Sequence, residues 1–205
     1  MDLILKRSPA TWYDANFLEL NVASECFYVC NSLQEWNRNI VNGFPLSRET
    51  IVFADDDIYE KLQSKEIKVP QIWGENICII KFPQELKNIK QSVEERTKET
   101  YNIALGNRYL RAKDKIAFHC DNEEFGNTQS IASISLGVPR TFTFVSKKEI
   151  AENEEHSLIL THGSLLFMGE NCQENYLHGM KKEKISEDPA FGKIRINVTF
   201  RIWNY

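Results

Sequence analysis

The chain of 205 residues carries a formal net charge of −4, with 42% hydrophobic and 26% charged residues. This composition excludes a disordered, collagen-like or coiled-coil protein, and the length suffices for one domain with a sizeable core. No apolar run approaches the roughly 20 residues that a membrane-spanning helix needs, and residues 1–10 lack the apolar region of a signal peptide. We therefore expect an intracellular protein, cytoplasmic or nuclear, without a membrane partner, and nothing requires more than a monomer.

The cysteines and the charge pattern narrow the class further. Five cysteines are an odd number and lie in apolar or helical contexts, which is not the pattern of a secreted disulfide framework, so we expect them to be reduced. The negative net charge gives no global sign of a nucleic-acid partner. Two short basic stretches, 107–115 and 180–184, are typical of solvated loops but leave such a partner open.

The first half of the chain predicts two helices separated by irregular structure. Residues 22–38 carry an apolar stripe at helical spacing, which predicts an amphipathic helix. A strand is predicted within residues 48–56, where it ends in an acidic turn. After Pro83, apolar residues again recur at helical spacing, and a proline directly before such a run is a start signal for a helix.

From about residue 101 the apolar period changes from helical to two. The β-rich runs are separated by polar or glycine-bearing segments, which favours a sandwich or barrel of antiparallel strands. The predicted fold class is therefore α+β, mainly β, with helices in residues 1–99 and a β core in residues 100–205 of a single domain. The predicted strands lie within residues 101–110, 115–120, 130–137, 140–146, 156–168 and 193–203.

The last of these strands has two contrasting faces. Isoleucine, valine and phenylalanine alternate with polar residues, and the polar face carries Arg195 and Arg201 but no acid. An outer strand with a wet face explains such alternation, although mixed charges are more usual there. The α-carbons of the two arginines lie roughly 20 Å apart in an extended strand. Two guanidinium groups leaning towards each other would suit a small dicarboxylate held at both ends.

The stretch "FHCD" places His119 and Asp121 two residues apart, on one face of a strand. This pair is either polar decoration of a turn or two ligands of a metal such as iron(II), which commonly binds two histidines and one carboxylate. The metal interpretation requires another histidine. His156 follows an acidic stretch and His162 precedes a glycine as in a turn. Chain order and context favour His178 over His162 without deciding between them.

Taken together, these motifs resemble a known family. The series "NRY", "FHCDNE", "SISLG", "TFTF", "HGSLLFM", "LHGM" and "RINVTFR" is similar to the AlkB group of iron(II)- and 2-oxoglutarate-dependent dioxygenases. The resemblance covers residues 100–203 clearly and residues 48–82 more faintly. It implies a double-stranded β-helix (jelly-roll) core within a single dioxygenase domain, preceded by helices and a lid that recognises the substrate.

The resemblance also implies a role for particular residues. His119, Asp121 and His178 would bind Fe(II), leaving positions open for 2-oxoglutarate and O2. Arg195 would bind the distal carboxylate of 2-oxoglutarate, and Arg201 would contact its other carboxylate or steady Asp121. His162 and Ser135 would belong to the scaffold. Three further residues match positions at the 2-oxoglutarate site, namely Asn107, Tyr109 and Asn197.

The activity that the resemblance implies is oxidative demethylation of DNA or RNA. The methyl group of a base such as N1-methyladenine or N3-methylcytosine would be hydroxylated and shed as formaldehyde, after the base leaves the stack. Glu123 matches a position that faces the damaged base, although it is equally a turn residue. Tyr59 and Trp73 lie in the region of the lid and offer faces for base stacking; core packing is the alternative for Trp73.

Two other functions stay open. The run Asp55–Asp57 would repel phosphate in a lid. It therefore keeps open a single-stranded or RNA substrate, and together with the net negative charge it motivates the same iron chemistry on a protein or a small molecule. A nucleic-acid binder without activity on the same fold is the third possibility, and the intact ligand residues argue against it. The sequence leaves the choice between DNA and RNA, and between single and double strands, undecided.

Overall fold

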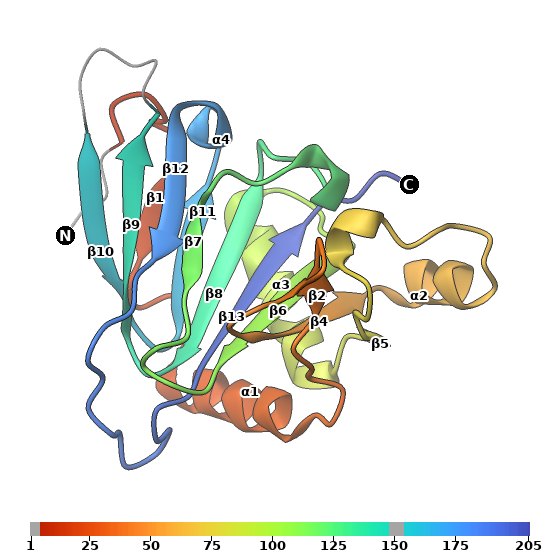
Figure 1. The fold of residues 1–205 in the computed structure, drawn as a ribbon, viewed down its shortest axis with the longest axis horizontal. Coiled ribbons are helices and arrows are strands. Elements are labelled where there is room, and N and C mark those ends of the chain that lie inside the picture. The colour runs from red at the N-terminus through yellow and green to blue at the C-terminus, as the bar shows by residue number, and fades with distance from the viewer. Residues whose placement is uncertain (1–4, 148–153) are drawn as a thin grey trace.

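The computed structural model describes residues 5–147 and 154–205. Two β-sheets face each other, as Figure 1 shows, and all strand pairs within them are antiparallel except β4 with β5. The predicted α+β, mainly β fold with a jelly-roll core is confirmed. The larger sheet has the order β1 (Trp12–Asp14), β11 (Ser164–Met168), β8 (Ile131–Gly137), β13 (Arg195–Arg201), β6 (Ile103–Tyr109), β4 (Glu49–Ala54) and β5 (Ile79–Lys81).

The smaller sheet lies across the face of the larger one that carries the polar side of β13. Its four strands run in the order β10 (Glu155–Leu160), β9 (Arg140–Ser146), β12 (Tyr176–Met180) and β7 (Ile116–His119). The strand β12 is not among the predicted strands, and His156 lies on β10, at the start of the predicted run 156–168. A separate hairpin is formed by β2 (Ile40–Val41) and β3 (Phe44–Pro45).

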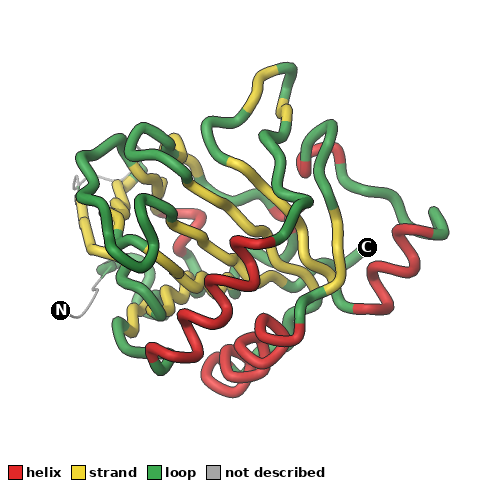
Figure 2. Tube along the Cα trace, turned by 90° about the horizontal axis from the view of Figure 1, so that it is seen from below, coloured by secondary structure: helices red, strands yellow, loops and turns green. Residues whose placement is uncertain are grey.

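Two helices cover the outer face of the larger sheet, where they pack against each other (Figure 2). They are α1 (Leu20–Ser32) and α3 (Gln84–Thr97), and α3 begins directly after Pro83 as predicted. The helix α1 ends six residues before the predicted boundary. It ends early because Trp36 turns back into the core, where its indole N–H donates to the carbonyl of Cys30.

The alternation of β13 is observed as predicted. Ile196, Val198 and Phe200 are fully buried in the core beneath α1 and α3. The opposite face of β13, with its arginines, lines a cavity between the sheets. On the core face, Gly106 of the neighbouring β6 permits the close packing of Trp36, since a β-carbon there would lie 2.8 Å from the Trp36 ring.

The sequence predicts a turn at the acidic run Asp55–Asp57, but in the structure this run begins a helix. Asp55 is the residue before α2 (Asp56–Gln63), and two further aspartates occupy its first turn. Negative charge is favourable there because the helix dipole is positive at its N-terminus. Lys87 and Lys90 of α3 also pair with Asp56 and Asp55. The aspartates therefore stabilise the contact between two helices.

The remaining elements are short: η1 (Gln71–Trp73) and η2 (Glu123–Phe125) are 3₁₀ helices, and α4 (Cys172–Asn175) is a single turn. The five cysteines are free, as expected. Across residues 5–147 and 154–205, no helix has the length and apolarity to cross a membrane. Strands from both predicted parts of the chain pair in the larger sheet; the single-domain organisation itself stays a prediction.

Candidate metal centre and ligand cavity

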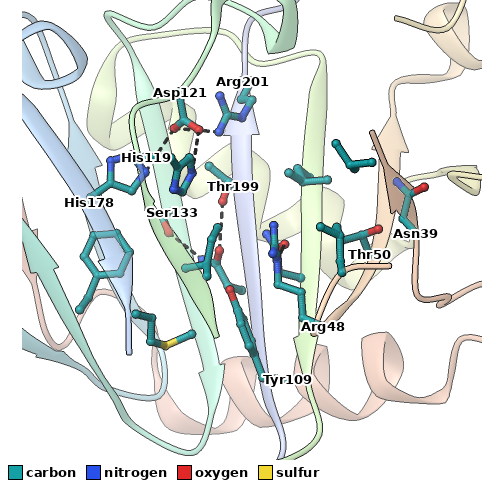
Figure 3. A pocket seen from close by; sticks show the side chains of 18 of the residues that line it. Asn39, Arg48, Thr50, Tyr109, His119, Asp121, Ser133, His178, Thr199 and Arg201 are labelled. Atoms are coloured by element: carbon teal, nitrogen blue, oxygen red, sulfur yellow. Dashed lines mark hydrogen bonds and ion pairs between the residues drawn. The ribbon is translucent and has the colours of Figure 1, made fainter. Parts of the chain in front are cut away.

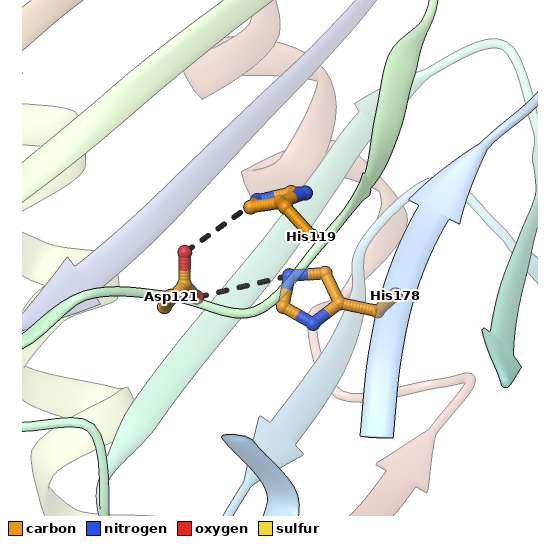
Figure 4. A group of neighbouring side chains, drawn as sticks. All are labelled: His119, Asp121 and His178. Atoms are coloured by element: carbon orange, nitrogen blue, oxygen red, sulfur yellow. Dashed lines mark ion pairs between the residues drawn. The ribbon is translucent and has the colours of Figure 1, made fainter. Parts of the chain in front are cut away.

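His119, Asp121 and His178 meet between the sheets, although His178 is far from the other two in sequence. Each offers one ligand atom, and these atoms all lie within 4.8 Å of one another (Figure 4). The pairing of β12 with β7 brings this about, because His178 lies directly opposite His119 in the register. Both Nε2 atoms face the carboxylate of Asp121, at 3.6 Å from His119 and 3.8 Å from His178.

Backbone and side-chain contacts hold two of these groups in place. The Nδ1 of His119 lies 2.8 Å from the carbonyl of Ala117, which only accepts, so Nδ1 carries the hydrogen and Nε2 keeps its lone pair. The backbone N–H of Asp121 donates to Oε1 of Gln173 at 2.8 Å. Gln173 is buried on α4, and no spacing in the sequence points to it.

The electrostatics of the cluster favour an ionised Asp121 beside a neutral His178. Burial alone would raise the pKa of Asp121, but Arg201 and the two histidines outweigh it and hold that pKa well below its usual range. Nη2 of Arg201 lies 3.0 Å from Oδ2 of Asp121. Burial lowers the pKa of His178 to about 4. Asp121 and His178 are thus in the protonation states that metal binding requires at neutral pH.

This donor set fits iron(II). Two imidazole nitrogens and one carboxylate form the facial triad that holds iron in non-haem oxygenases and leaves positions open for other ligands. Nδ1 of His178 is buried and has no hydrogen-bond partner among the described residues, so its ring is oriented by packing between Phe142 and Phe144. A metal contact at Nε2 would add the directional restraint that the ring otherwise lacks.

The cavity extends from this cluster along β13 to Arg195 (Figure 3 shows its labelled side chains). Arg195 is 2% exposed, and burial lowers its pKa to about 10. Its Nη2 donates to Oγ of Ser135, while its Nε has no hydrogen-bond partner among the described residues. Tyr109 lies beside it, with the ring centroid 5.5 Å from Cζ. Ser135, expected as scaffold only, therefore orients this guanidinium.

Arg195 differs from the other buried arginines in having no carboxylate within ion-pair distance in the described part of the chain. Arg201 pairs with Asp121, and Arg140 pairs with Glu183. A buried cation without a counter-charge is costly. The Arg195 end of the cavity is therefore chemically suited to the carboxylate of a ligand, which would supply both the missing charge and the missing acceptor.

The two predicted asparagines line the same cavity but are already hydrogen-bonded. Oδ1 of Asn107 accepts from Nε of Arg48, a residue that the sequence interpretation missed. Nδ2 of Asn197 donates to Oγ of Ser133. The only sequence signal for Arg48 is its position directly before β4, where one more step of the alternation places it next to Thr50 on the cavity side.

The structure does not bring together the three predicted base contacts. Tyr59 lies on α2 with the ammonium of Lys81 over its ring, and it is not part of the cavity lining. Glu123 begins η2 and is exposed outside the lining. Trp73 does line the cavity, but its ring is 2% exposed and packs 4.8 Å from the ring of Trp203. The predictions for Tyr59 and Glu123 rest on local sequence resemblance, which does not define the orientation of α2 and η2.

His162, the alternative to His178 as a metal ligand, makes hydrogen bonds that connect parts of the fold. Nδ1 of His162 accepts from the backbone N–H of Gly137, and its Nε2 lies 3.2 Å from Oγ of Ser24. Burial lowers its pKa. His162 thus ties the turn between β10 and β11 to α1 and to the end of β8, outside the metal cluster.

Comparisons with known proteins agree with this geometry. A human protein, alpha-ketoglutarate-dependent dioxygenase alkB homolog 3, is 36% identical over 123 residues, which cover 57% of this chain and 41% of that protein. DNA oxidative demethylase ALKBH2 of Arabidopsis thaliana is 33% identical over 50% of this chain and 38% of its own length. The chain therefore spans less than half the length of these curated relatives.

Two further comparisons cover nearly the whole chain. The solved structure of OsALKBH1 superimposes with a TM-score of 0.64 at 16% identity, over 97% of this chain and 100% of that one, which shows a shared fold. A family model for the 2OG-Fe(II) oxygenase superfamily matches residues 16–201. The chain belongs to the 2OG-Fe(II) oxygenase superfamily, within which its sequence is AlkB-like.

Proposed function

We propose that the protein is an Fe(II)- and 2-oxoglutarate-dependent oxygenase that removes N-linked methyl groups from the bases of DNA or RNA. One observation carries the proposal. A cluster of two histidines and one carboxylate lies at one end of a cavity whose other end holds a buried guanidinium without a carboxylate partner among the described residues. This arrangement suits a metal and a dicarboxylate side by side.

The residues of the chain divide the work. His119, Asp121 and His178 hold Fe(II), and Arg195 binds the far carboxylate of 2-oxoglutarate, which orients the 2-oxo acid towards the metal. Arg201 keeps Asp121 ionised and directed at the cluster. With Fe(II), 2-oxoglutarate and O2 bound, oxidative decarboxylation to succinate supplies one oxygen atom for hydroxylation of a C–H bond. The hydroxymethyl group on a base nitrogen then leaves as formaldehyde.

The choice of a nucleic-acid substrate rests on the relatives, whose names include a DNA oxidative demethylase. A base must be extruded from its stack to reach a metal buried between two sheets. The acidic run that motivated a protein or small-molecule substrate has a structural explanation at the start of α2, where Lys90, Lys87 and Lys61 pair with its three aspartates. That alternative then rests on the net negative charge of the chain alone. The monomeric state and the intracellular location stay predictions.

A substrate panel tests the proposal. Pure protein is incubated with Fe(II), ascorbate and 2-oxoglutarate in the presence of oligonucleotides that contain N1-methyladenine or N3-methylcytosine, as single-stranded DNA, double-stranded DNA or RNA. We expect loss of the methyl group with release of formaldehyde on at least one of them, and no formaldehyde from unmethylated controls. Succinate formation without methyl loss on any oligonucleotide would contradict the nucleic-acid substrate.

A further inference from the structure

Four connections cross between the sheets at the Arg195 end of the cavity; one of them, residues 161–163, joins β10 to β11, and the other three meet at Arg140. Residues 110–115 join β6 to β7, residues 138–139 join β8 to β9, and residues 181–194 join β12 to β13. The register places them together, because Arg195 lies opposite Tyr109 on one side and Gly137 on the other. In Figure 1 all three connections lie at the lower end of the sheets.

The side chain of Arg140 ties these connections to one another. Arg140 is the first residue of β9, and its side chain is fully buried. Its Nη2 donates to two carbonyl groups, that of Asp114 at 3.1 Å and that of Lys181 at 2.9 Å. One guanidinium thus holds the β6–β7 connection and the β12–β13 connection at a fixed separation.

Glu183 completes the attachment from the other side. Its Oε1 accepts from Nε of Arg140 and from the backbone N–H of Thr141, and its Oε2 accepts from the hydroxyl of Thr141. Its own backbone N–H donates to the carbonyl of Ala112. Both carboxylate oxygens of Glu183 therefore bind the start of β9, and its backbone N–H binds the β6–β7 connection.

Two of these connections join strands that carry residues of the proposed site. His119 and His178 lie on the smaller sheet, whereas Arg195 lies on the larger one. A ligand that contacts the metal and Arg195 spans the space between the sheets. Tyr109 marks how close the attachment is, because its ring centroid lies 5.5 Å from Cζ of Arg195 and 6.0 Å from Cζ of Arg140.

We propose that the Arg140–Glu183 pair is a positioning unit that fixes the span between the metal ligands and Arg195 and thereby selects a five-carbon 2-oxo dicarboxylate. The inference rests on the proposed function and adds the origin of its co-substrate length selectivity. Neither Arg140 nor Glu183 lines the cavity. A four-carbon or six-carbon analogue differs by one methylene, and a misplacement of about 1 Å at an active site is enough to cost about a hundredfold.

Direct binding tests the inference without turnover. Calorimetry measures the affinity of Mn(II)-loaded protein for oxaloacetate, 2-oxoglutarate and 2-oxoadipate, in the wild type and in Arg140→Lys, Glu183→Gln and Thr141→Val. In the variants we expect the affinity for 2-oxoglutarate to fall about tenfold. The ratio of this affinity to the affinities for oxaloacetate and 2-oxoadipate should also fall. The Mn(II) affinity should change by less than about twofold. Thermal unfolding establishes that each variant is folded, and Thr141→Val, the mildest change, serves where Arg140→Lys does not fold.

Glu49→Gln is the matched control. Glu49 pairs with Arg108 across β4 and β6, and this partly buried glutamate–arginine pair lies outside the cavity lining. We expect the control to keep the wild-type order of affinities. Variants of Arg140 and Glu183 that bind 2-oxoglutarate less tightly but keep the same relative preference would overturn the positioning role and leave the proposed function standing. A wild type that binds none of the three acids would overturn both.

Discussion

Nη2 of Arg201 lies 3.0 Å from Oδ2 of Asp121, and both side chains are buried at the edge of the metal cluster. In the metal-free protein, the positive charge of Arg201 balances the negative charge of the Asp121 carboxylate. Once a divalent cation is bound, the cation contributes to the same balance. The sequence left open whether Arg201 binds a carboxylate of the co-substrate or steadies Asp121, and the geometry supports the second role.

Replacing Arg201 is therefore expected to destabilise the metal-free protein more than the metal-loaded protein. Arg201→Met removes one partner of a buried pair, which typically costs about 3–5 kcal/mol of unfolding free energy. Urea unfolding with and without Mn(II) measures the difference, and Arg201→Lys, which keeps the charge, is expected to lose less. An equal loss in the presence and absence of the metal would contradict this balance of charge.

Arg195→Gln is expected to raise the 2-oxoglutarate requirement. A hydrogen bond to a charged group contributes about 1.5–3 kcal/mol, which corresponds to a KM for 2-oxoglutarate roughly 10- to 100-fold higher. The measurement is succinate formation at increasing 2-oxoglutarate. Lys193→Gln is the control, since Lys193 is exposed and pairs with Glu187. An unchanged KM in Arg195→Gln would remove Arg195 from the co-substrate site.

His162 is expected to make stability depend on pH. Burial lowers its folded-state pKa from the ordinary value of 6.5. The unfolded chain therefore binds the proton first, and the stabilisation present above pH 6.5 is lost as the pH falls through the folded-state pKa. Protonation also removes the acceptor for the Gly137 N–H.

Urea unfolding of wild type and His162→Gln across this range measures the effect. We expect the wild type to be more stable above pH 6.5 and the difference between the two proteins to shrink at lower pH. A difference that stays constant, or that grows as the pH falls, would show that the imidazole does not act in its neutral form.

Trp73 and Tyr59 are expected to respond differently to truncation. Trp73 is buried against Trp203, so Trp73→Ala should cost about 3–5 kcal/mol of unfolding free energy. Tyr59 lies outside the cavity lining, so Tyr59→Ala should leave the KM for a methylated oligonucleotide unchanged. Chemical unfolding and demethylation kinetics measure the two outcomes. A raised oligonucleotide KM in Tyr59→Ala would restore this residue to the substrate site.

Much of the site follows from short-range patterns. The alternation of residues 193–203 assigns Arg195, Asn197 and Arg201 to one face, because successive strand residues point to opposite sides whatever the rest of the fold does. The expectation that His119 and Asp121 share one face of a strand was wrong, because β7 ends at His119 and Asp121 lies just beyond it, although the two side chains still meet. The histidine that joins them is different: only the register of β12 against β7 places His178 opposite His119, and pairing between distant segments is not encoded in either segment alone.

The missed features depend on contacts with distant residues. The aspartates before α2 are favourable at a helix start, but the lysines that pair with them come from α3. Arg48 and Gln173 each bond to a residue more than 50 positions away. For Glu123, the orientation of a short 3₁₀ helix decides the outcome, and local sequence does not define it.

The central claim is that His119, Asp121 and His178 hold the iron. Chelator competition under anaerobic conditions measures the Fe(II) affinity of the wild type, of His178→Gln and of His162→Gln, a histidine that lies outside the cluster. We predict tight binding of one Fe(II) per chain by the wild type and by His162→Gln, and loss of that binding in His178→Gln. Equal Fe(II) affinity in His178→Gln and the wild type would contradict the assignment.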